Sequence, residues 1–292
     1  MSKLNPEKFK VTAPVDLAEA PTKINHQKSE KVMEKMLEET REELGDLQNT
    51  LYAHGKYSVL VCIQGMDTAG KDSLIREVFK DFNVRGVEVH SFKVPTELER
   101  RHDYLWRHYL ALPRRGTFGV FNRTHYENVL VTRVHPEYIL GELLPDVNDI
   151  SDVDDSFWDK RFEQIRGFEK TIAQNGTIIF KFFLHLSKDE QKNRLLRRLR
   201  KKNKQWKFSP GDLKERKEWD NYQRCYQDAI NRTNEEHAPW YVIPADDKPT
   251  ARYLVAKVLL DTMKTYDDIV EPLLDPEIMA HIDQYREQLE KE

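Results

Sequence analysis

The sequence predicts an α/β protein built on a parallel sheet, and three features favour this class. Apolar stretches of strand length alternate with amphipathic helical patterns along most of the 292 residues. A glycine-rich loop, residues 65–71, joins the first strand pattern to a helical one. Residues 177–184 are almost continuously apolar, as in strands that a parallel sheet buries on both faces. Ligands of such sheets gather at the carboxyl ends of the strands.

The chain before the glycine-rich loop is expected to form an extended arm and one long helix. Residues 1–25 are polar and contain three prolines. Residues 25–54 carry one apolar stripe at helical spacing and end before Gly55. We therefore divide the chain into this N-terminal part, residues 1–54, a domain over residues 55–270, and a C-terminal helix within 271–292.

The first strand and the loop after it fit a phosphate-binding P-loop. The loop has the pattern Gly-x-x-x-x-Gly-Lys, in which glycines let the backbone wrap around phosphate oxygens. Backbone N–H groups and the start of the following helix face the anion, and a lysine adds a mobile charge. A solvated turn is the alternative, but the strand–loop–helix context favours the P-loop. The expected phosphate-binding residues are Gly65, Ala69, Gly70, Lys71 and Asp72.

One position of this loop departs from the usual pattern. Asp72 follows the lysine where Ser or Thr normally supplies a hydroxyl for Mg²⁺. An additional carboxylate, Asp67, lies inside the loop. Because Mg²⁺ prefers carboxylate oxygens, we expect Asp67 to hold the metal, directly or through water.

Strands and helices are expected to alternate after the P-loop helix. Strands are predicted at residues 87–92, 117–121, 177–184 and 240–244. Helices are predicted from residue 97 through 106, at 157–173, from 188 onward, and at 212–231, 250–266 and 276–289. Residues 146–155 hold five aspartates, which we interpret as an exposed acidic loop in preference to a metal site.

The third strand is followed by polar residues at a position where a parallel sheet places its ligands. Asn122 occupies the place where P-loop proteins keep a metal-binding acid, and Arg123 can bind phosphate in bidentate fashion. The alternative for Arg123 is a surface pair with Glu127, four residues on. His125 and His135 are expected to make ordinary hydrogen bonds, and four aromatic side chains are expected in the core: Tyr104, Trp106, Trp219 and Trp240.

A strongly basic segment begins after the fourth strand. Residues 192–207 contain nine lysines and arginines and no carboxylate. A solvated helix face is the simpler interpretation, but uncompensated repulsion between these charges favours a lid that binds an anion, over about residues 188–215. Arg194 and Arg198, spaced i and i+4, are the candidates to reach inward.

The composition argues against a membrane protein and against a secreted protein. Charged residues make up 33% of the chain, and no segment approaches the length of a membrane helix, so we expect neither a membrane span nor a membrane partner. The N-terminus lacks the apolar core of a signal peptide, and Cys62 and Cys225 are expected as buried thiols, which favours a cytoplasmic protein. The net charge of −3 means that anion binding must come from local clusters of cations.

These residues resemble the type-2 polyphosphate kinases, which move phosphate between inorganic polyphosphate and nucleotides. The resemblance runs from about Leu51 to Lys264. Its markers are residues 65–72, 94–96, 103–107, 121–127, 206–210 and 238–241.

The resemblance implies a fold, substrates and site residues. The fold is a three-layer α/β/α P-loop kinase, similar to thymidylate kinase, with five parallel strands and a helical lid. It implies Mg²⁺, with Mn²⁺ as a substitute, at Asp67 and Asn122, and reversible transfer of phosphate to adenine nucleotides, with guanine nucleotides as further candidates. Asn122 at the second metal-site position resembles the branch of the family that phosphorylates both AMP and ADP. Lys71 and Arg123 would contact the transferring phosphate, Arg194 and Arg198 the polyphosphate chain, and Asn122, Glu127 and Arg133 the nucleotide.

The family also implies a homo-oligomer, often a tetramer, to which the N-terminal arm and long helix are candidates to contribute. Two other functions are weighed against this one. An ordinary nucleoside monophosphate kinase would use ATP as donor, and its loop would carry Ser or Thr at position 72. A nucleic-acid-binding protein could use the basic segment, but this leaves Asp67 and Lys71 unexplained, so we expect no nucleic-acid partner.

Overall fold

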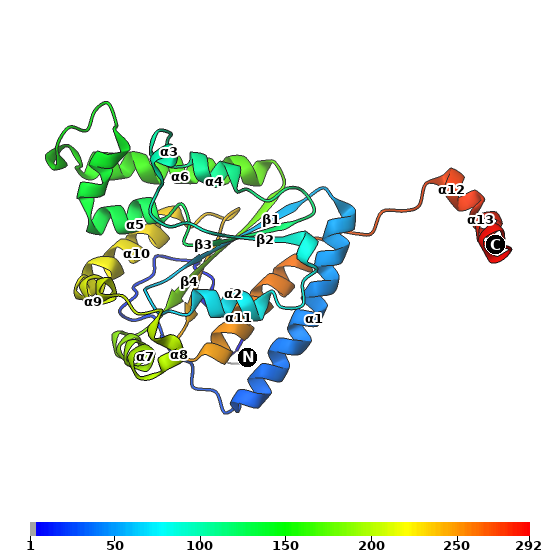
Figure 1. Cartoon of the computed structure of the whole chain (residues 1–292), viewed down its shortest axis with the longest axis horizontal. Coiled ribbons are helices and arrows are strands. Elements are labelled where there is room, and N and C mark those ends of the chain that lie inside the picture. The colour runs from blue at the N-terminus through cyan, green and yellow to red at the C-terminus, as the bar shows by residue number, and fades with distance from the viewer. Residues whose placement is uncertain (1–3) are drawn as a thin grey trace.

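A five-stranded, all-parallel sheet forms the centre of the computed structural model, which describes residues 4–292 (Figure 1). The strand order is β2-β3-β1-β4-β5, with β1 (Ser58–Gln64) in the middle. The other strands are β2 (Val87–Ser91), β3 (Phe118–Asn122), β4 (Thr177–His185) and β5 (Trp240–Pro244). This confirms the parallel α/β class and the positions predicted for the strands to within one or two residues.

The register of the sheet brings the predicted ligand-binding loops to one edge. Ile63, near the end of β1, pairs with Asn122 at the end of β3, and Ser91 at the end of β2 pairs with Asn122 from the other side. Because parallel strands end at the same edge, the P-loop and the loop after Asn122 lie next to each other.

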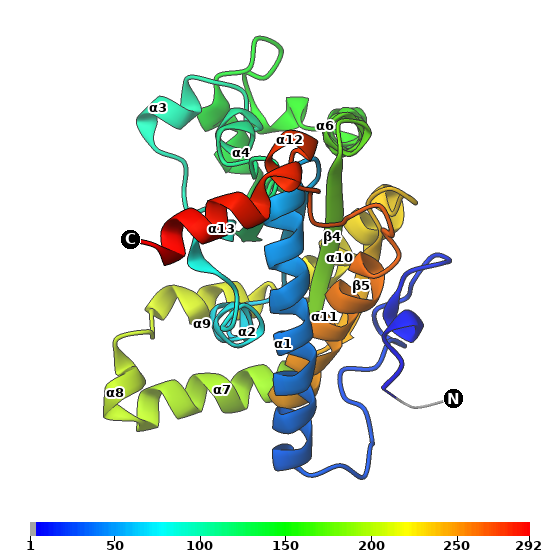
Figure 2. The same ribbon diagram turned by 90° about the vertical axis from the view of Figure 1, so that its right-hand side faces the viewer.

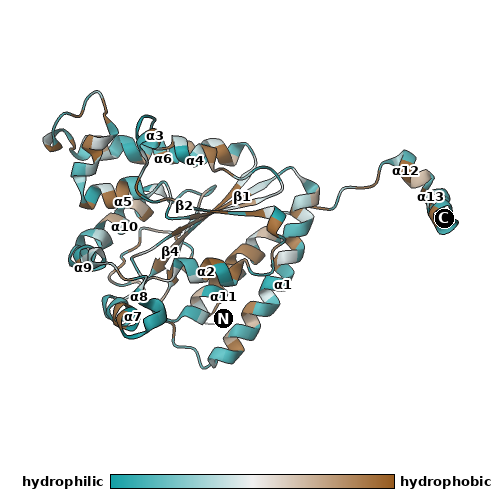
Figure 3. Ribbon diagram, in the orientation of Figure 1, coloured by the Kyte–Doolittle hydropathy of each residue, from teal (hydrophilic) through white to brown (hydrophobic). Residues whose placement is uncertain are grey.

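Helices cover both faces of the sheet, as the alternation of side chains along β1 shows. Val59, Val61 and Ile63 belong to the core formed with α1 (Glu30–His54), α2 (Lys71–Val78) and α11 (Lys248–Met263). Leu60 and Cys62 belong to the core on the opposite face, where α6 (Asp155–Gln174) packs. The three layers are visible in Figure 1, and in Figure 3 the brown, apolar residues concentrate in the strands and in the helix surfaces that face them.

Three segments predicted as single helices each form two helices, so these three predictions are wrong. The first becomes α3 (Glu97–Arg100) and α4 (Trp106–Leu110), because the Asp103 side chain accepts a hydrogen bond from the backbone of Leu105 and starts a new helix. The second becomes α9 (Pro210–Lys217) and α10 (Trp219–Thr233), and the third α12 (Pro276–Ala280) and α13 (Ile282–Glu290). Trp106 is half-buried and stacks on His102, so it lies outside the core where it was expected.

The remaining helical elements have the following bounds. The α-helices are α5 (Glu127–Val134), α7 (Lys188–Arg200) and α8 (Lys202–Gln205), and the 3₁₀ helices are η1 (Pro6–Phe9), η2 (Val84–Gly86), η3 (Pro136–Glu142) and η4 (Ile150–Asp152). The acidic segment therefore contains η4 between exposed turns, and none of the described residues forms a cluster of acidic, histidine or cysteine side chains suited to a metal.

The N-terminal arm lies on its own chain. The backbone N–H of Val11 donates to the carbonyl of Trp240 (2.9 Å), and Val15 exchanges two hydrogen bonds with the Asn231 side chain (2.8 and 2.9 Å). Figure 2 shows this segment beside β5 and α10. The helix after it begins at Glu30, five residues later than predicted, because Ser29 takes the extended conformation of an N-cap.

The C-terminal residues have a different character. The segment with α12 and α13 projects away from the body (Figure 1), and it exposes large apolar side chains: Val270, Leu273, Leu274, Ile278, Met279, Ile282, Tyr285 and Leu289. Both cysteines are buried and unpaired, as expected. Among the described residues, no helix combines the length and the apolar character needed to cross a membrane.

Candidate active site

A cleft of about 970 Å³ opens at the carboxyl ends of β1, β2 and β3, beneath α7 and α8. Eleven lysines and arginines line it, against four carboxylates. The cations are Lys71, Arg76, Lys93, Arg123, Arg194, Arg197, Arg198, Lys204, Lys207, Lys248 and Arg252. Such an excess of positive charge around a hollow attracts polyanions.

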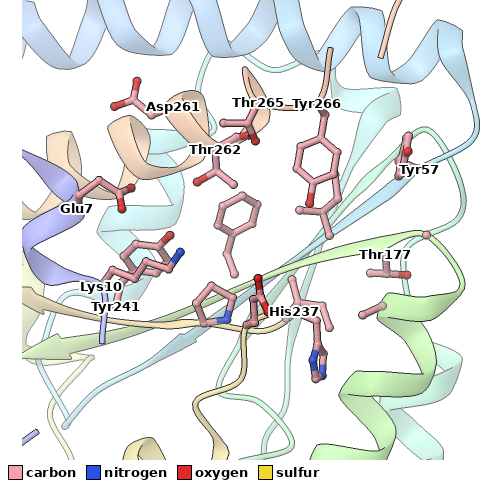
Figure 4. A pocket seen from close by; sticks show the side chains of 17 residues that line it. Glu7, Lys10, Tyr57, Thr177, His237, Tyr241, Asp261, Thr262, Thr265 and Tyr266 are labelled. Atoms are coloured by element: carbon pink, nitrogen blue, oxygen red, sulfur yellow. The ribbon is translucent and has the colours of Figure 1, made fainter. Parts of the chain in front are cut away.

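A second hollow, of about 580 Å³, lies at the amino ends of β4 and β5, and its lining has the opposite character. Figure 4 shows Glu7 of η1 and Lys10, the residue after η1, on one side of it and Thr262, Thr265 and Tyr266 on another. Lys10 is the one lysine or arginine among the described residues that line it, whereas three carboxylates do so: Glu7, Glu236 and Asp261. The anion site is therefore the first cleft.

The P-loop has the backbone conformation that the glycines predict. Gly65 has φ +155°, and a Cβ added there would lie 3.0 Å from the carbonyl oxygen of Leu184 and 3.1 Å from the Ala69 side chain. Gly70 has φ +107° and directly precedes the first residue of α2. The loop consequently presents the start of a helix to the cleft, which is where a phosphate group binds.

Lys71 is the first residue of α2, and its side chain reaches back over this loop. Its ammonium group donates to the carbonyl oxygen of Gly65 (2.5 Å). Desolvation lowers the pKa of Lys71, and the charge of Arg123 lowers it further, while the carboxylates of Asp67, Glu127 and Asp72 act in the opposite direction. The lysine charge is thus held close to a second cation, an arrangement that a bound phosphate would stabilise.

Arg123 joins the two loops of the site. Its Nη2 donates to Asp67 Oδ1 (3.0 Å), and its Nη1 lies 3.5 Å from Glu127 Oε2. Desolvation opposes the charge, but Glu127 and Asp67 outweigh it and raise the pKa of Arg123. The sequence left two interpretations of Arg123 open, a surface pair with Glu127 and a position at the ligand site. The structure shows both, because Arg123 lies at the cleft and is paired with Glu127.

Asn122 offers one free oxygen. Its side-chain nitrogen donates to Asp72 Oδ1 (2.9 Å) and to Ser91 Oγ (3.3 Å), while its Oδ1 is buried without a hydrogen-bond partner. Asp67 and Asn122 thus place hard oxygen atoms at the same cleft. Mg²⁺ is commonly held by one or two carboxylates together with substrate phosphates, so this donor set fits such an ion once a phosphate compound supplies further ligands.

Arg194 does not present its charge freely to the cleft. All five N–H donors of its guanidinium are used by acceptors of the protein: Glu190 Oε1 (2.8 Å) and the carbonyl oxygens of Thr68 (3.1 Å), Ala69 (2.8 Å), Ala245 (2.6 Å) and Asp246 (3.0 Å). Arg194 thereby ties the root of α7 to the P-loop. Arg198 is held less firmly, by the carbonyl of Lys207 (3.2 Å) and by Asp212 (3.1 Å).

Seven cations of the cleft have no ion pair with any described residue: Lys71, Lys93, Arg197, Lys204, Lys207, Lys248 and Arg252. Burial, together with the charges of neighbouring cations, Arg194 first among them, lowers the pKa of Lys248 to about 8. The sequence reasoning missed Lys248 and Arg252. Their signal is an i, i+4 pair of cations at the start of the helix that follows the last strand.

Arg133, predicted to contact the nucleotide, lies outside the described lining of the cleft. It pairs with Asp228 and packs over Trp158 and Phe162. Among the histidines, His125 bonds Glu169 and His135 bonds Glu215, each at 3.0 Å, so both make the ordinary hydrogen bonds expected of them.

The sequence family described as Polyphosphate kinase 2 (PPK2) matches residues 27–270, which is most of the chain. The chain belongs to the polyphosphate kinase 2 family. It is accordingly a kinase-type phosphotransferase with a P-loop.

Relatives and a solved structure agree with this membership. The chain is 44% identical over 278 residues to an ADP-polyphosphate phosphotransferase of Rhodopseudomonas palustris, covering 95% of both proteins. It is 48% identical over 221 residues to an AMP/ADP-polyphosphate phosphotransferase of Meiothermus ruber, covering 76% of this chain and 77% of that protein. The crystal structure of Polyphosphate Kinase 2 from Arthrobacter aurescens TC1 superposes with a TM-score of 0.87 at 34% identity, covering 97% and 96% of the two chains.

Proposed function

We propose that this enzyme transfers the terminal phosphate of inorganic polyphosphate to ADP, forming ATP, and to AMP, forming ADP. The names of the two relatives described above support both acceptors. The observation that carries the proposal is the excess of cations around a P-loop, because two polyanions that repel each other must meet there.

A divalent cation, Mg²⁺ or Mn²⁺ in its place, would be held by Asp67 and Asn122. When bound, it neutralises charge on the phosphate oxygens. The free Oδ1 of Asn122 and the carboxylate of Asp67 support this assignment.

The residues of the chain itself position and neutralise the reactants. Lys71 and Arg123 are placed to contact the transferring phosphate, where charge spreads over its equatorial oxygens. The terminal phosphate of the nucleotide is already a nucleophile, so no strong base is required. The segment around residues 188–215 acts as a lid that excludes water and prevents hydrolysis of polyphosphate.

The two substrates approach from different sides. Four of the unpaired cations lie on α7, α8 and α11, and they favour polyphosphate on that side of the cleft: Arg197, Lys204, Lys248 and Arg252. The nucleotide then lies toward the ends of β2 and β3, near Asn122 and Glu127. Arg133 of α5, which is paired with Asp228 of α10, holds these two helices together instead of contacting the nucleotide directly.

The decisive assay supplies long-chain polyphosphate with ADP, AMP, GDP or GMP in the absence of ATP. We expect ATP from ADP and ADP from AMP, and no product with Lys71→Ala. If product formed only when ATP was the donor, the enzyme would be an ordinary nucleoside monophosphate kinase. Tight, salt-sensitive binding of oligonucleotides that Lys71→Ala leaves unchanged would favour the nucleic-acid alternative.

We also infer a cytoplasmic homo-oligomer. Both cysteines are free, and nucleotides are substrates of that compartment. The C-terminal segment exposes apolar side chains that a second copy of the chain can cover. Light scattering of the full chain and of residues 1–270 tests this, with a lower mass expected for the shorter chain and an equal mass contradicting the role of the segment.

A further inference from the structure

A fully buried ion pair lies directly behind the loop that carries Arg123. Lys181, in the middle of β4, places its Nζ 2.7 Å from Glu169 Oε2 of α6, and neither side chain is exposed to solvent. Strand β4 is otherwise made of apolar side chains at this depth. A charged pair at such a position is expensive to desolvate, and apolar residues of the same size often serve stability equally well or better.

The contacts of this pair lead to the residues beside Arg123. Glu169 Oε1 is 3.0 Å from His125 Nε2 and accepts a hydrogen bond from the Tyr126 hydroxyl (2.8 Å). Lys181 donates to the Tyr126 hydroxyl (3.0 Å) and to the backbone carbonyl of Thr233 (2.6 Å). His125 and Tyr126, the second and third residues after Arg123, therefore both contact the same buried ion pair.

The loop needs such a support because its backbone is strained. Arg123 has φ +57°, in the left-handed region that residues with a side chain rarely adopt. Thr124 is held from the side of the P-loop strand, where Gln64 Nε2 donates to its hydroxyl (3.1 Å). On the opposite side, His125 and Tyr126 hold the loop through their contacts with Glu169 and Lys181. The loop that contains Arg123 is therefore anchored from two sides.

We propose that Glu169 and Lys181 are positioning residues for phosphate transfer: through His125 and Tyr126 they fix the loop that directs Arg123 and Asn122 into the cleft. This inference rests on the proposed function. A purely structural pair would affect only stability, whereas a positioning pair affects the turnover of enzyme that is fully folded.

The test separates these two roles by comparing single and double replacements. Glu169→Leu and Lys181→Met each leave one buried charge unpaired and are expected to lower the Tm by roughly 10 °C. The double variant E169L/K181M removes both charges at similar volume, and its Tm is expected within about 4 °C of the wild type. Its kcat is nevertheless expected to fall about 100-fold, with the KM of both substrates changed less than about threefold, because the groups around the transferring phosphate are misplaced.

A matched pair elsewhere controls for the loss of an ion pair as such. Arg41 of α1 pairs with Asp81 after α2, and its side chain is 7% exposed. The double variant R41M/D81L is expected to keep kcat within about twofold of the wild type. If E169L/K181M recovers both Tm and kcat, the pair is only structural and the inference is overturned.

A second variant covers the case in which the double replacement does not fold. Tyr126→Phe conserves volume and removes the hydroxyl that joins the loop to both members of the pair. We expect about a tenfold loss of kcat in soluble protein whose circular dichroism matches the wild type, and an unchanged kcat overturns the inference. Absence of phosphate transfer from polyphosphate in the wild type itself would instead reject the proposed function.

Discussion

Asp67 and Arg123 face each other across the site, with 3.0 Å between Oδ1 and Nη2, and belong to loops that follow β1 and β3. The pair is partly exposed, with 29% and 43% of the two side chains accessible. A pair of this kind contributes at most about 1 kcal/mol to folding. We therefore propose that the two charges serve the substrates more than the fold, with the arginine binding phosphate and the carboxylate binding the metal.

Asp67→Asn is accordingly expected to separate activity from stability. It removes the proposed metal ligand, so kcat should fall by about 10³-fold while the Tm changes by less than about 4 °C. Steady-state kinetics across a series of Mg²⁺ concentrations and a thermal melt measure both. Asp261→Asn removes a surface partner of Lys257 and is the control expected to leave kcat unchanged. Comparable activity in the two variants would contradict the role of Asp67.

Lys248 is expected to make the binding of polyphosphate depend on pH. Because its pKa is lowered to about 8, the side chain is charged below that pH and loses its charge as the pH rises through it. Loss of one charged contact corresponds to about 1 kcal/mol, so the KM for polyphosphate should rise roughly fivefold between pH 7 and pH 9.

The control for this effect is Lys248→Met, which cannot lose a proton at that position. Its KM for polyphosphate should already be raised at pH 7 and should change less between pH 7 and pH 9 than the KM of the wild type. An identical pH profile for both proteins would show that another group titrates. The KM for ADP is the internal reference, because Lys248 lies on the opposite side of the cleft from the proposed nucleotide position.

Arg252 lies one helical turn beyond Lys248 and should act only on long chains. Arg252→Gln is expected to raise the KM for long-chain polyphosphate about tenfold and to leave the KM for a chain of three or four phosphates unchanged, because a short chain does not extend to it. Lys257→Gln, on the same helix but away from the described lining of the cleft, is the matched control. An equal effect on short and long chains would place Arg252 near the reacting phosphate instead.

The sequence predicted the sheet well because its information is local. The alternation of strand and helix patterns and the near-continuous apolar run of β4 gave the parallel class, and the glycine pattern located the P-loop within one residue of its observed position. The sequence did not reveal the helix breaks around Asp103, at Glu218 and at His281. Each break lies in a segment whose apolar spacing remains helical on both sides, so the pattern alone predicts one continuous helix.

The site was predicted in part, and for a physical reason. Lys71, Asp67 and Arg123 meet because strand ends converge, which topology alone implies. Lys248 and Arg252 were missed because a pair of cations in an ordinary helix gives no sign of where that helix packs. The paired position of Arg133 likewise depends on Asp228, a contact between α5 and α10 that the residue pattern does not contain.

Arg194 and Arg198 are expected to differ, although the sequence offers them as equivalent lid cations. Arg194 is 7% exposed, and two of its five hydrogen bonds go to the P-loop carbonyl groups of Thr68 and Ala69, so Arg194→Gln should lower the Tm by roughly 5–10 °C and raise the KM of both substrates. Arg198→Gln should leave the Tm within about 3 °C and raise the KM for polyphosphate alone, because its contacts lie within the lid. Melting curves and the two KM values decide: a selective effect of Arg194→Gln on polyphosphate, at unchanged Tm, would mean that this guanidinium leaves the P-loop carbonyls and binds the chain directly.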